Sequence, residues 1–184
     1  NFVAKNLPNS FSVLAATEEN NLFFAPDTYM EKIAIGSNLP RNLLDLDNSI
    51  EKNIKLLSDA KNKSINQITA CVLKRTRHDK IVNSLEQLGV RIRFISDGDV
   101  SGAISVADPK SNIDIYLGIG GGPEGVLAAS ALDAFDCHFQ GRFIFDNEED
   151  IKDANAMGIK DLNKKYELNE IIKGDSIFCA TGIT

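Results

Sequence analysis

Cysteine and histidine are scarce in this sequence. The 184 residues contain only three cysteines, Cys71, Cys137 and Cys179, and two histidines, His78 and His138. The cysteines show no C-x-x-C pairing, and Cys71 and Cys179 fall in apolar, strand-like runs, so we expect buried, reduced thiols. With so few nitrogen and sulfur ligands, the composition argues against a His-rich zinc site.

An excess of basic charge and a long apolar run are also missing. The formal net charge is −6 and the Lys and Arg residues are dispersed, which argues against a nucleic-acid partner. No apolar run approaches the roughly 20 residues of a membrane span, and the first residues do not resemble a signal peptide. These two absences lead us to expect a cytoplasmic protein without a membrane partner. The 43% of hydrophobic residues predicts a globular chain that can bury a core.

A glycine-rich stretch, Gly118–Val126, joins the most strand-like run, Ile113–Leu117, to the most helix-like run, Val126–Leu132. The pattern predicts a strand, a glycine loop and a helix whose N-terminus attracts an anion such as phosphate. Glu124 in the first turn would repel that phosphate unless a cation lay between them. The stretch therefore indicates a metal-assisted phosphate enzyme.

The same glycines have other interpretations. They are also compatible with a tight β–α connection in which glycine only permits close packing. A P-loop is excluded because Gly-Lys-Ser/Thr is absent, and the dinucleotide fingerprint is broken by Pro123. A nicotinamide-linked oxidoreductase that uses Gly118–Gly122 and Asp146 is therefore only a minor alternative.

Strand-like and helix-like segments alternate along most of the chain. The predicted strands are 69–74, 90–95, 113–117, 142–145 and 176–180. The predicted helices are 47–62, with Asn48 and Glu51 as its capping residues, 79–88, 100–106, 123–135, 148–157 and 169–173. This alternation predicts a mostly parallel sheet covered by helices on both faces. Before it, Phe11–Thr17 and Leu22–Ala25 predict a hairpin, and Met30–Ile35 predicts a further strand.

Polar residues gather directly after four of the predicted strands. These sets are Arg75–His78, Ser96–Asp99, the glycine stretch with Glu124, and Thr181–Gly182. Ligands of open α/β sheets bind at the carboxyl ends of the strands, so parallel strands would bring all four sets to one edge.

The chemistry of these sets suits a phosphorylated polyol, although each set also has a structural interpretation. Arg75 and Arg77 match phosphate oxygens, and their spacing in an extended segment would point both the same way, but they also fit a solvated basic turn. Asp97 and Asp99 suit sugar hydroxyls or a metal, whereas Asp99 could equally cap the following helix. We interpret His78 as a structural residue at a helix start, because no nucleophile motif accompanies it.

Taken together, these residues resemble class II fructose-1,6-bisphosphatase, including the bifunctional fructose/sedoheptulose bisphosphatases of photosynthetic bacteria. Where relatives often carry Lys-Pro-Arg or Arg-Pro-Arg, this chain has Arg75-Thr-Arg77. Six stretches match in order across the whole chain: Ala25–Lys32, Arg77–Asp79, Ile95–Val100, Gly118–Val126, Ala156–Ile159 and Ala180–Thr184.

The resemblance implies a layered α/β sandwich of the lithium-sensitive sugar-phosphatase type. It also implies Mg²⁺- or Mn²⁺-dependent removal of the C1 phosphate of fructose 1,6-bisphosphate, in gluconeogenesis or the Calvin cycle, by a homo-oligomer. Glu124 matches a metal ligand of the family. The positions that match substrate contacts are Tyr29, Arg75, Thr76, Arg77, Asp97, Gly98, Asp99 and Gly121.

The family's other metal carboxylates, with an Asp-Pro-x-Glu-Gly-Thr segment, lie upstream of the stretch that resembles Asn1–Val3, and the family usually continues beyond Ala180–Thr184. We therefore expect the 184 residues to be a carboxyl-side portion without catalytic residues of its own, inactive in isolation. Residues 1–46 would be the remainder of an amino-terminal α+β domain, and residues 47–184 a carboxyl-side α/β domain. A non-catalytic sugar-phosphate-binding or regulatory module is the alternative.

Overall fold

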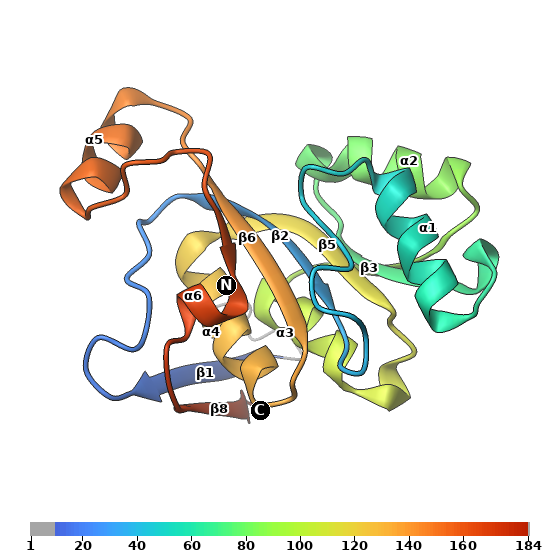
Figure 1. Ribbon diagram of the computed structural model, residues 1–184, viewed down its shortest axis with the longest axis horizontal. Coiled ribbons are helices and arrows are strands. Elements are labelled where there is room, and N and C mark those ends of the chain that lie inside the picture. The colour runs from blue at the N-terminus through green and yellow to red at the C-terminus, as the bar shows by residue number, and fades with distance from the viewer. Residues whose placement is uncertain (1–9, 184) are drawn as a thin grey trace.

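The computed structural model describes residues 10–183 and shows an α/β fold built around a six-stranded sheet (Figure 1). The strand order across this sheet is β4-β3-β5-β2-β6-β7. The strands are β2 (Tyr29–Ile35), β3 (Thr69–Leu73), β4 (Arg91–Ile95), β5 (Ile115–Gly121), β6 (His138–Ile144) and β7 (Lys165–Glu167). A separate two-stranded sheet pairs β1 (Ser10–Thr17) with β8 (Ser176–Ile183).

The sheet is mixed, so the prediction of a mostly parallel sheet was wrong. Only β3 pairs in parallel, with β4 and β5, whereas the pairs β2–β5, β2–β6 and β6–β7 are antiparallel. The alternating segments do give co-directional strands, because β5 and β6 are both antiparallel to β2 and so run the same way. Strand β2, which precedes both in the chain, lies between them. Strands β5 and β6 therefore do not pair with each other, and each pairs antiparallel with β2.

Helices cover both faces of this sheet (Figure 1). Alternation along β2 explains the two layers, since Ile33 and Ile35 face one core, and Met30 and Ala34 face the other. The first core includes residues of α1 (Ile50–Lys61) and α2 (Asp79–Gln87); the second includes α3 (Asp99–Ile104) and α4 (Gly122–Asp133). The remaining helices are α5 (Glu148–Ala156) and α6 (Leu168–Ile171), with 3₁₀ turns at Ile65–Gln67, Thr76–His78, Ser105–Ala107 and Pro109–Ser111.

The predicted amino-terminal hairpin is wrong. Strand β1 pairs antiparallel with β8 at the other end of the described chain, from Ser10 opposite Ile183 to Thr17 opposite Ser176. Leu22 makes only an isolated bridge with Ile172. The β1–β8 ribbon packs on α4, and its inward-facing side chains such as Val13 and Phe178 are partly buried against the core.

Two local predictions also need correction. Ser49, not Asn48, caps α1, because the Ser49 side chain accepts a hydrogen bond from the Lys52 amide. The glycine stretch is not a loop, because β5 continues through Gly121 and α4 begins at Gly122. The division of the chain near residue 46 stays a prediction. Within residues 10–183, no helix is long and apolar enough to cross a membrane.

Candidate active site

The predicted polar residues meet at one edge of the six-stranded sheet. Arg75, Asp97 and Gly121 lie at or just beyond the carboxyl ends of β3, β4 and β5, which run in parallel. Tyr29 opens the antiparallel strand β2 opposite Gly121, so it joins the same edge. The fourth predicted set, Thr181–Gly182, belongs to β8 in the separate sheet, so its place at this edge was wrongly predicted.

The two arginines diverge instead of pointing the same way. Only Arg75 is extended, because a 3₁₀ turn begins at Thr76. The Arg75 guanidinium donates to the carbonyl of Ser96 at 2.7 Å, on the β4 side. Arg77 donates through Nε to the carbonyl of Ile119 in β5 at 2.8 Å and lies 5.0 Å from the centre of the Tyr29 ring. The edge therefore carries two separate cationic groups.

His78 is structural, as predicted. It is fully buried, its Nδ1 donates to the Leu73 carbonyl at 2.7 Å, and its Nε2 accepts the Ile119 amide at 2.8 Å. These two bonds link β3 to β5.

Asp99 lies inside the molecule and does not cap its helix. The N-cap of α3 is Gly98, whose left-handed φ of 88° favours glycine. The Asp99 carboxylate accepts hydrogen bonds from the Lys32 ammonium and the Tyr116 hydroxyl, and its side chain is 5% exposed. Burial, followed by the charge of Asp99, holds the pKa of Tyr116 well above its usual range, so the hydroxyl remains a donor.

Lys32 was missed by the sequence analysis. Its side chain is fully buried, and its Nζ donates to Asp99 and, at 2.8 Å, to the carbonyl of Gly121. Burial lowers the pKa of Lys32, while the adjacent Asp99 carboxylate opposes that shift. The sequence did contain a signal for this residue. In an alternating strand Lys32 lies on the same core-facing side as Met30 and Ala34, where a lysine is rarely buried unless it is paired.

The glycines of β5 and α4 make room for this buried trio of Lys32, Asp99 and Tyr116. A Cβ atom on Gly120 would lie 2.5 Å from Asp99 Oδ2, and one on Gly118 would lie 2.6 Å from the Tyr116 hydroxyl. A Cβ on Gly125 would meet Lys32 Cε at 3.0 Å. Close packing, the alternative interpretation of the glycine stretch, therefore explains these three positions.

Glu124 and Asp97 lie on the exposed side of the edge. Glu124 stands in the first turn of α4 and accepts the Gly121 amide through Oε2 at 3.1 Å. Asp97 accepts the Gly98 amide at 3.0 Å and lies 3.7 Å from Arg75. Both carboxylates are thus held by backbone amides while facing solvent.

The described residues do not form a metal centre by themselves. Within residues 10–183 no three His, Cys, Asp or Glu side chains are grouped closely enough to hold a metal ion. The cysteines are free thiols; Cys71 and Cys137 are buried, whereas Cys179 is exposed, contrary to the prediction. Burial raises the pKa of Cys71 to about 11, so this thiol stays protonated.

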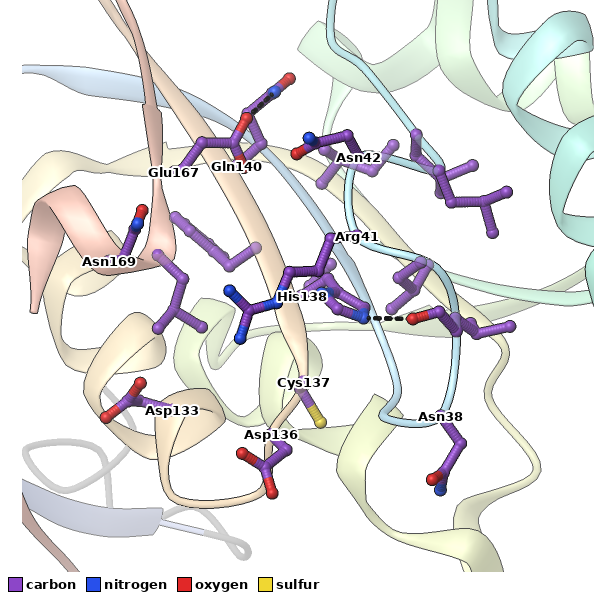
Figure 2. Close-up of a pocket in the computed structure, with 18 residues that line it drawn as sticks. Asn38, Arg41, Asn42, Asp133, Asp136, Cys137, His138, Gln140, Glu167 and Asn169 are labelled. Carbon is purple, nitrogen blue, oxygen red and sulfur yellow. Dashed lines mark hydrogen bonds between the residues drawn. The ribbon is translucent and has the colours of Figure 1, made fainter.

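A separate pocket of about 650 Å³ opens at the opposite edge of the sheet, where Ile35 pairs with His138 (Figure 2). Its lining includes Arg41, Asp133 and Asp136, and His138 donates to the Leu39 carbonyl at 2.9 Å. None of the predicted site residues lines this pocket.

The fold and the edge define an α/β protein that presents two arginines and backbone-anchored carboxylates at the carboxyl ends of its parallel strands. Comparison with known families identifies the class, because the model of the bacterial, glpX-encoded fructose-1,6-bisphosphatases matches residues 1–184. The chain belongs to this family.

Individual relatives agree with this assignment. The chain is 38% identical over 197 residues to a protein of Trichodesmium erythraeum and 39% identical to one of Synechocystis, both named D-fructose 1,6-bisphosphatase class 2/sedoheptulose 1,7-bisphosphatase. A relative of the same name from Prochlorococcus marinus is 38% identical over 198 residues. All of this chain is covered, but only 57–59% of each relative, so the chain spans little more than half their length.

Proposed function

We propose that this chain supplies the substrate-binding edge of an enzyme that hydrolyses the C1 phosphate of fructose 1,6-bisphosphate, giving fructose 6-phosphate and phosphate. The meeting of Arg75, Arg77, Tyr29 and Asp97 at one edge is the observation that carries the proposal. Family membership supports the reaction, and we extend it to a cytoplasmic homo-oligomer with the layered fold of the lithium-sensitive phosphatases. Residues 1–46 would complete a second, amino-terminal domain.

The arginines would bind phosphate. Ile119 takes the Nε–H of Arg77, which leaves the terminal guanidinium nitrogens as the donors that a phosphate would meet. The exposed Tyr29 ring stacks near that guanidinium and limits its movement. Thr76 lies between the two arginines in the 3₁₀ turn and would add a hydroxyl to the same phosphate site.

The sugar would lie against the ends of β4 and β5. Asp97 is exposed and offers oxygen acceptors for hydroxyl groups, while Gly98 and Gly121 permit close approach to the backbone. Asp99 has both carboxylate oxygens engaged, so it would accept a sugar hydroxyl only through its remaining lone pairs.

Glu124 would provide one ligand of a Mg²⁺ or Mn²⁺ site. Its carboxylate is exposed and held by the Gly121 amide, which fits a hard-cation ligand, but one carboxylate does not make a site. When bound, the cation would neutralise phosphate charge during hydrolysis. Further ligands would have to come from outside the described residues.

The metal role is tested by substituting two glutamates, each of which lies in the first turn of a helix. The experiment uses the complete protein that the gene encodes. Glu124→Gln should reduce turnover about 100-fold, since even the partners of metal ligands contribute 10–100-fold, and should raise the Mg²⁺ concentration needed for half-maximal activity. Glu149→Gln, in the first turn of α5, controls for the interaction of a carboxylate with the helix dipole. It should change neither the turnover nor the Mg²⁺ concentration for half-maximal activity. Equal kinetics for both variants would contradict the metal role.

The absence of a three-ligand group within residues 10–183 favours a second candidate for the isolated chain, a non-catalytic sugar-phosphate-binding module. The isolated chain would then bind fructose 6-phosphate in a calorimetric titration but release no phosphate from the bisphosphate. Metal-dependent phosphate release by the 184-residue chain would exclude this candidate.

A further inference from the structure

Lys32 is a charged side chain in a position that is otherwise apolar. It is fully buried in the core-facing side of β2, and burying an ammonium group is costly unless it is paired. The charged groups that face it are Asp99, Glu124 and Arg77. Of these, Asp99 makes direct contact.

The Lys32 ammonium joins two elements that the sheet alone does not connect. One hydrogen bond goes to Asp99, the first residue of α3, and the other goes to the Gly121 carbonyl at the end of β5, at 2.8 Å. The amide of the same Gly121 donates to Glu124 at 3.1 Å. From one buried nitrogen, hydrogen bonds therefore extend to Asp99 and, through Gly121, to Glu124.

We propose that Lys32 is a positioning residue that fixes two carboxylates relative to each other: Asp99, which is expected to bind the sugar, and Glu124, which is expected to bind the metal. This inference rests on the proposed function, because the roles of Asp99 and Glu124 come from it. Lys32 does not reach solvent and so acts through its two partners.

The packing around the ammonium leaves little freedom for another arrangement. Any Cβ on Gly120 would overlap the Asp99 carboxylate, and Gly125 lies against Lys32 Cε. Tyr116 holds the second Asp99 oxygen but, unlike Lys32, makes no bond to Gly121 within the described residues. Tyr116→Phe is therefore a matched control that loosens Asp99 alone.

The kinetic experiment uses the complete protein. Lys32→Met should raise both the KM for fructose 1,6-bisphosphate and the Mg²⁺ concentration for half-maximal activity by about tenfold, the effect of losing a charge-assisted hydrogen bond. Tyr116→Phe should raise the KM and leave the Mg²⁺ dependence unchanged. A Lys32→Met variant that loses stability or kcat while both constants stay at wild-type values would show a merely structural lysine and overturn the proposal.

If Lys32→Met does not fold, Lys32→Met/Asp99→Asn removes both charges of the pair. This double variant should still need about tenfold more Mg²⁺ than the wild type, because the Gly121 contact is lost. An unchanged Mg²⁺ requirement would overturn the proposal.

A second readout does not depend on activity. With ¹⁵N-labelled glycine, the amide signal of Gly122 reports on the adjacent Gly121 carbonyl and should shift in Lys32→Met but not in Tyr116→Phe. If the wild-type protein released no phosphate, the proposed function would fail, and this signal would still decide the role of Lys32. An unshifted Gly122 signal in Lys32→Met would overturn the positioning role.

Discussion

The two edges of the six-stranded sheet differ in how their carboxylate side chains are held. At the edge formed by the carboxyl ends of β3, β4 and β5, the buried Asp99 carboxylate receives hydrogen bonds from two different strands. At the opposite edge, Asp133 and Asp136 line an open pocket, and neither forms an ion pair with another residue between 10 and 183. The first edge therefore holds its buried carboxylate with an ammonium and a hydroxyl group, whereas these two carboxylates of the second edge have no cationic partner among those residues.

This difference shows why a pocket's size does not locate the site. The 650 Å³ pocket is concave, yet none of the predicted site residues lines it. At the polar edge, burial fixes Lys32 and Asp99, and backbone amides hold Glu124 and Asp97. Fixed dipoles and charges are what a binding or catalytic site requires.

The largest expected effect is on stability, at Asp99. Asp99→Asn should lower the free energy of unfolding by about 3–5 kcal/mol, because it leaves the Lys32 ammonium buried without its counter-ion. Asp97→Asn, two residues away and exposed, should stay within about 0.5 kcal/mol of the wild type. Urea unfolding would check both, and similar midpoints for the two variants would contradict the contrast.

Next in size is Gly120→Ala. The new methyl group would overlap the Asp99 carboxylate, so we expect a loss of about 1–3 kcal/mol. Gly182→Ala is the control, because a Cβ there meets nothing within 4 Å. Equal melting temperatures for the two alanine variants would show that the trio tolerates displacement.

The third prediction compares one arginine from each edge. In the complete protein, Arg77→Ala should weaken binding of fructose 6-phosphate about tenfold through loss of a charge-assisted phosphate contact. Arg41→Ala, at the opposite pocket, should leave the dissociation constant unchanged. Calorimetric titration measures both constants, and equal losses would place the ligand elsewhere.

The smallest expected effect is a gain in the free energy of unfolding rather than a loss. Burial and the charges of Asp136 and Asp175 raise the pKa of Asp133, the last residue of α4. Its folded form therefore favours the protonated acid, and the stability it contributes at low pH is lost as the pH rises above about 3.8 through the folded pKa. Asp133→Asn should thus raise stability at pH 7 by about 0.5 kcal/mol and leave it unchanged at pH 3. Unfolding curves at both pH values would test this, and a less stable variant at pH 7 would contradict it.

Much of the fold followed from local pattern. The βα alternation, the strand over Met30–Ile35 and the structural His78 were predictable, because periodicity and burial act over short stretches of chain. Pairing partners were not predictable. β1 has the composition of a hairpin strand, and only tertiary structure reveals that its partner β8 lies at the other end of the chain.

The candidate site was predictable in residue type but less so in geometry. Arg75 and Arg77 were expected to point together, and the turn at Thr76 separated them because a 3₁₀ conformation does not keep the alternation of a strand. Asp99 was expected to contact sugar hydroxyls or a metal, or to cap the following helix, and its burial follows from Lys32 and Tyr116, which lie on strands far away in sequence. Such partnerships are set by packing rather than by local sequence.

The insertion of β2 between β5 and β6 has a consequence for synthesis on the ribosome. Glu31 of β2 and its ion-pair partner Arg142 of β6 are 111 positions apart, so the early strand emerges long before its second neighbour. At a synthesis rate of about 5–20 residues per second, roughly 5–20 s pass between the synthesis of β2, with its lysine, and that of β6. Both edges of β2 lack a partner until β5 has been made, and one edge stays open until β6 follows, so this strand is exposed to pairing with other chains during synthesis.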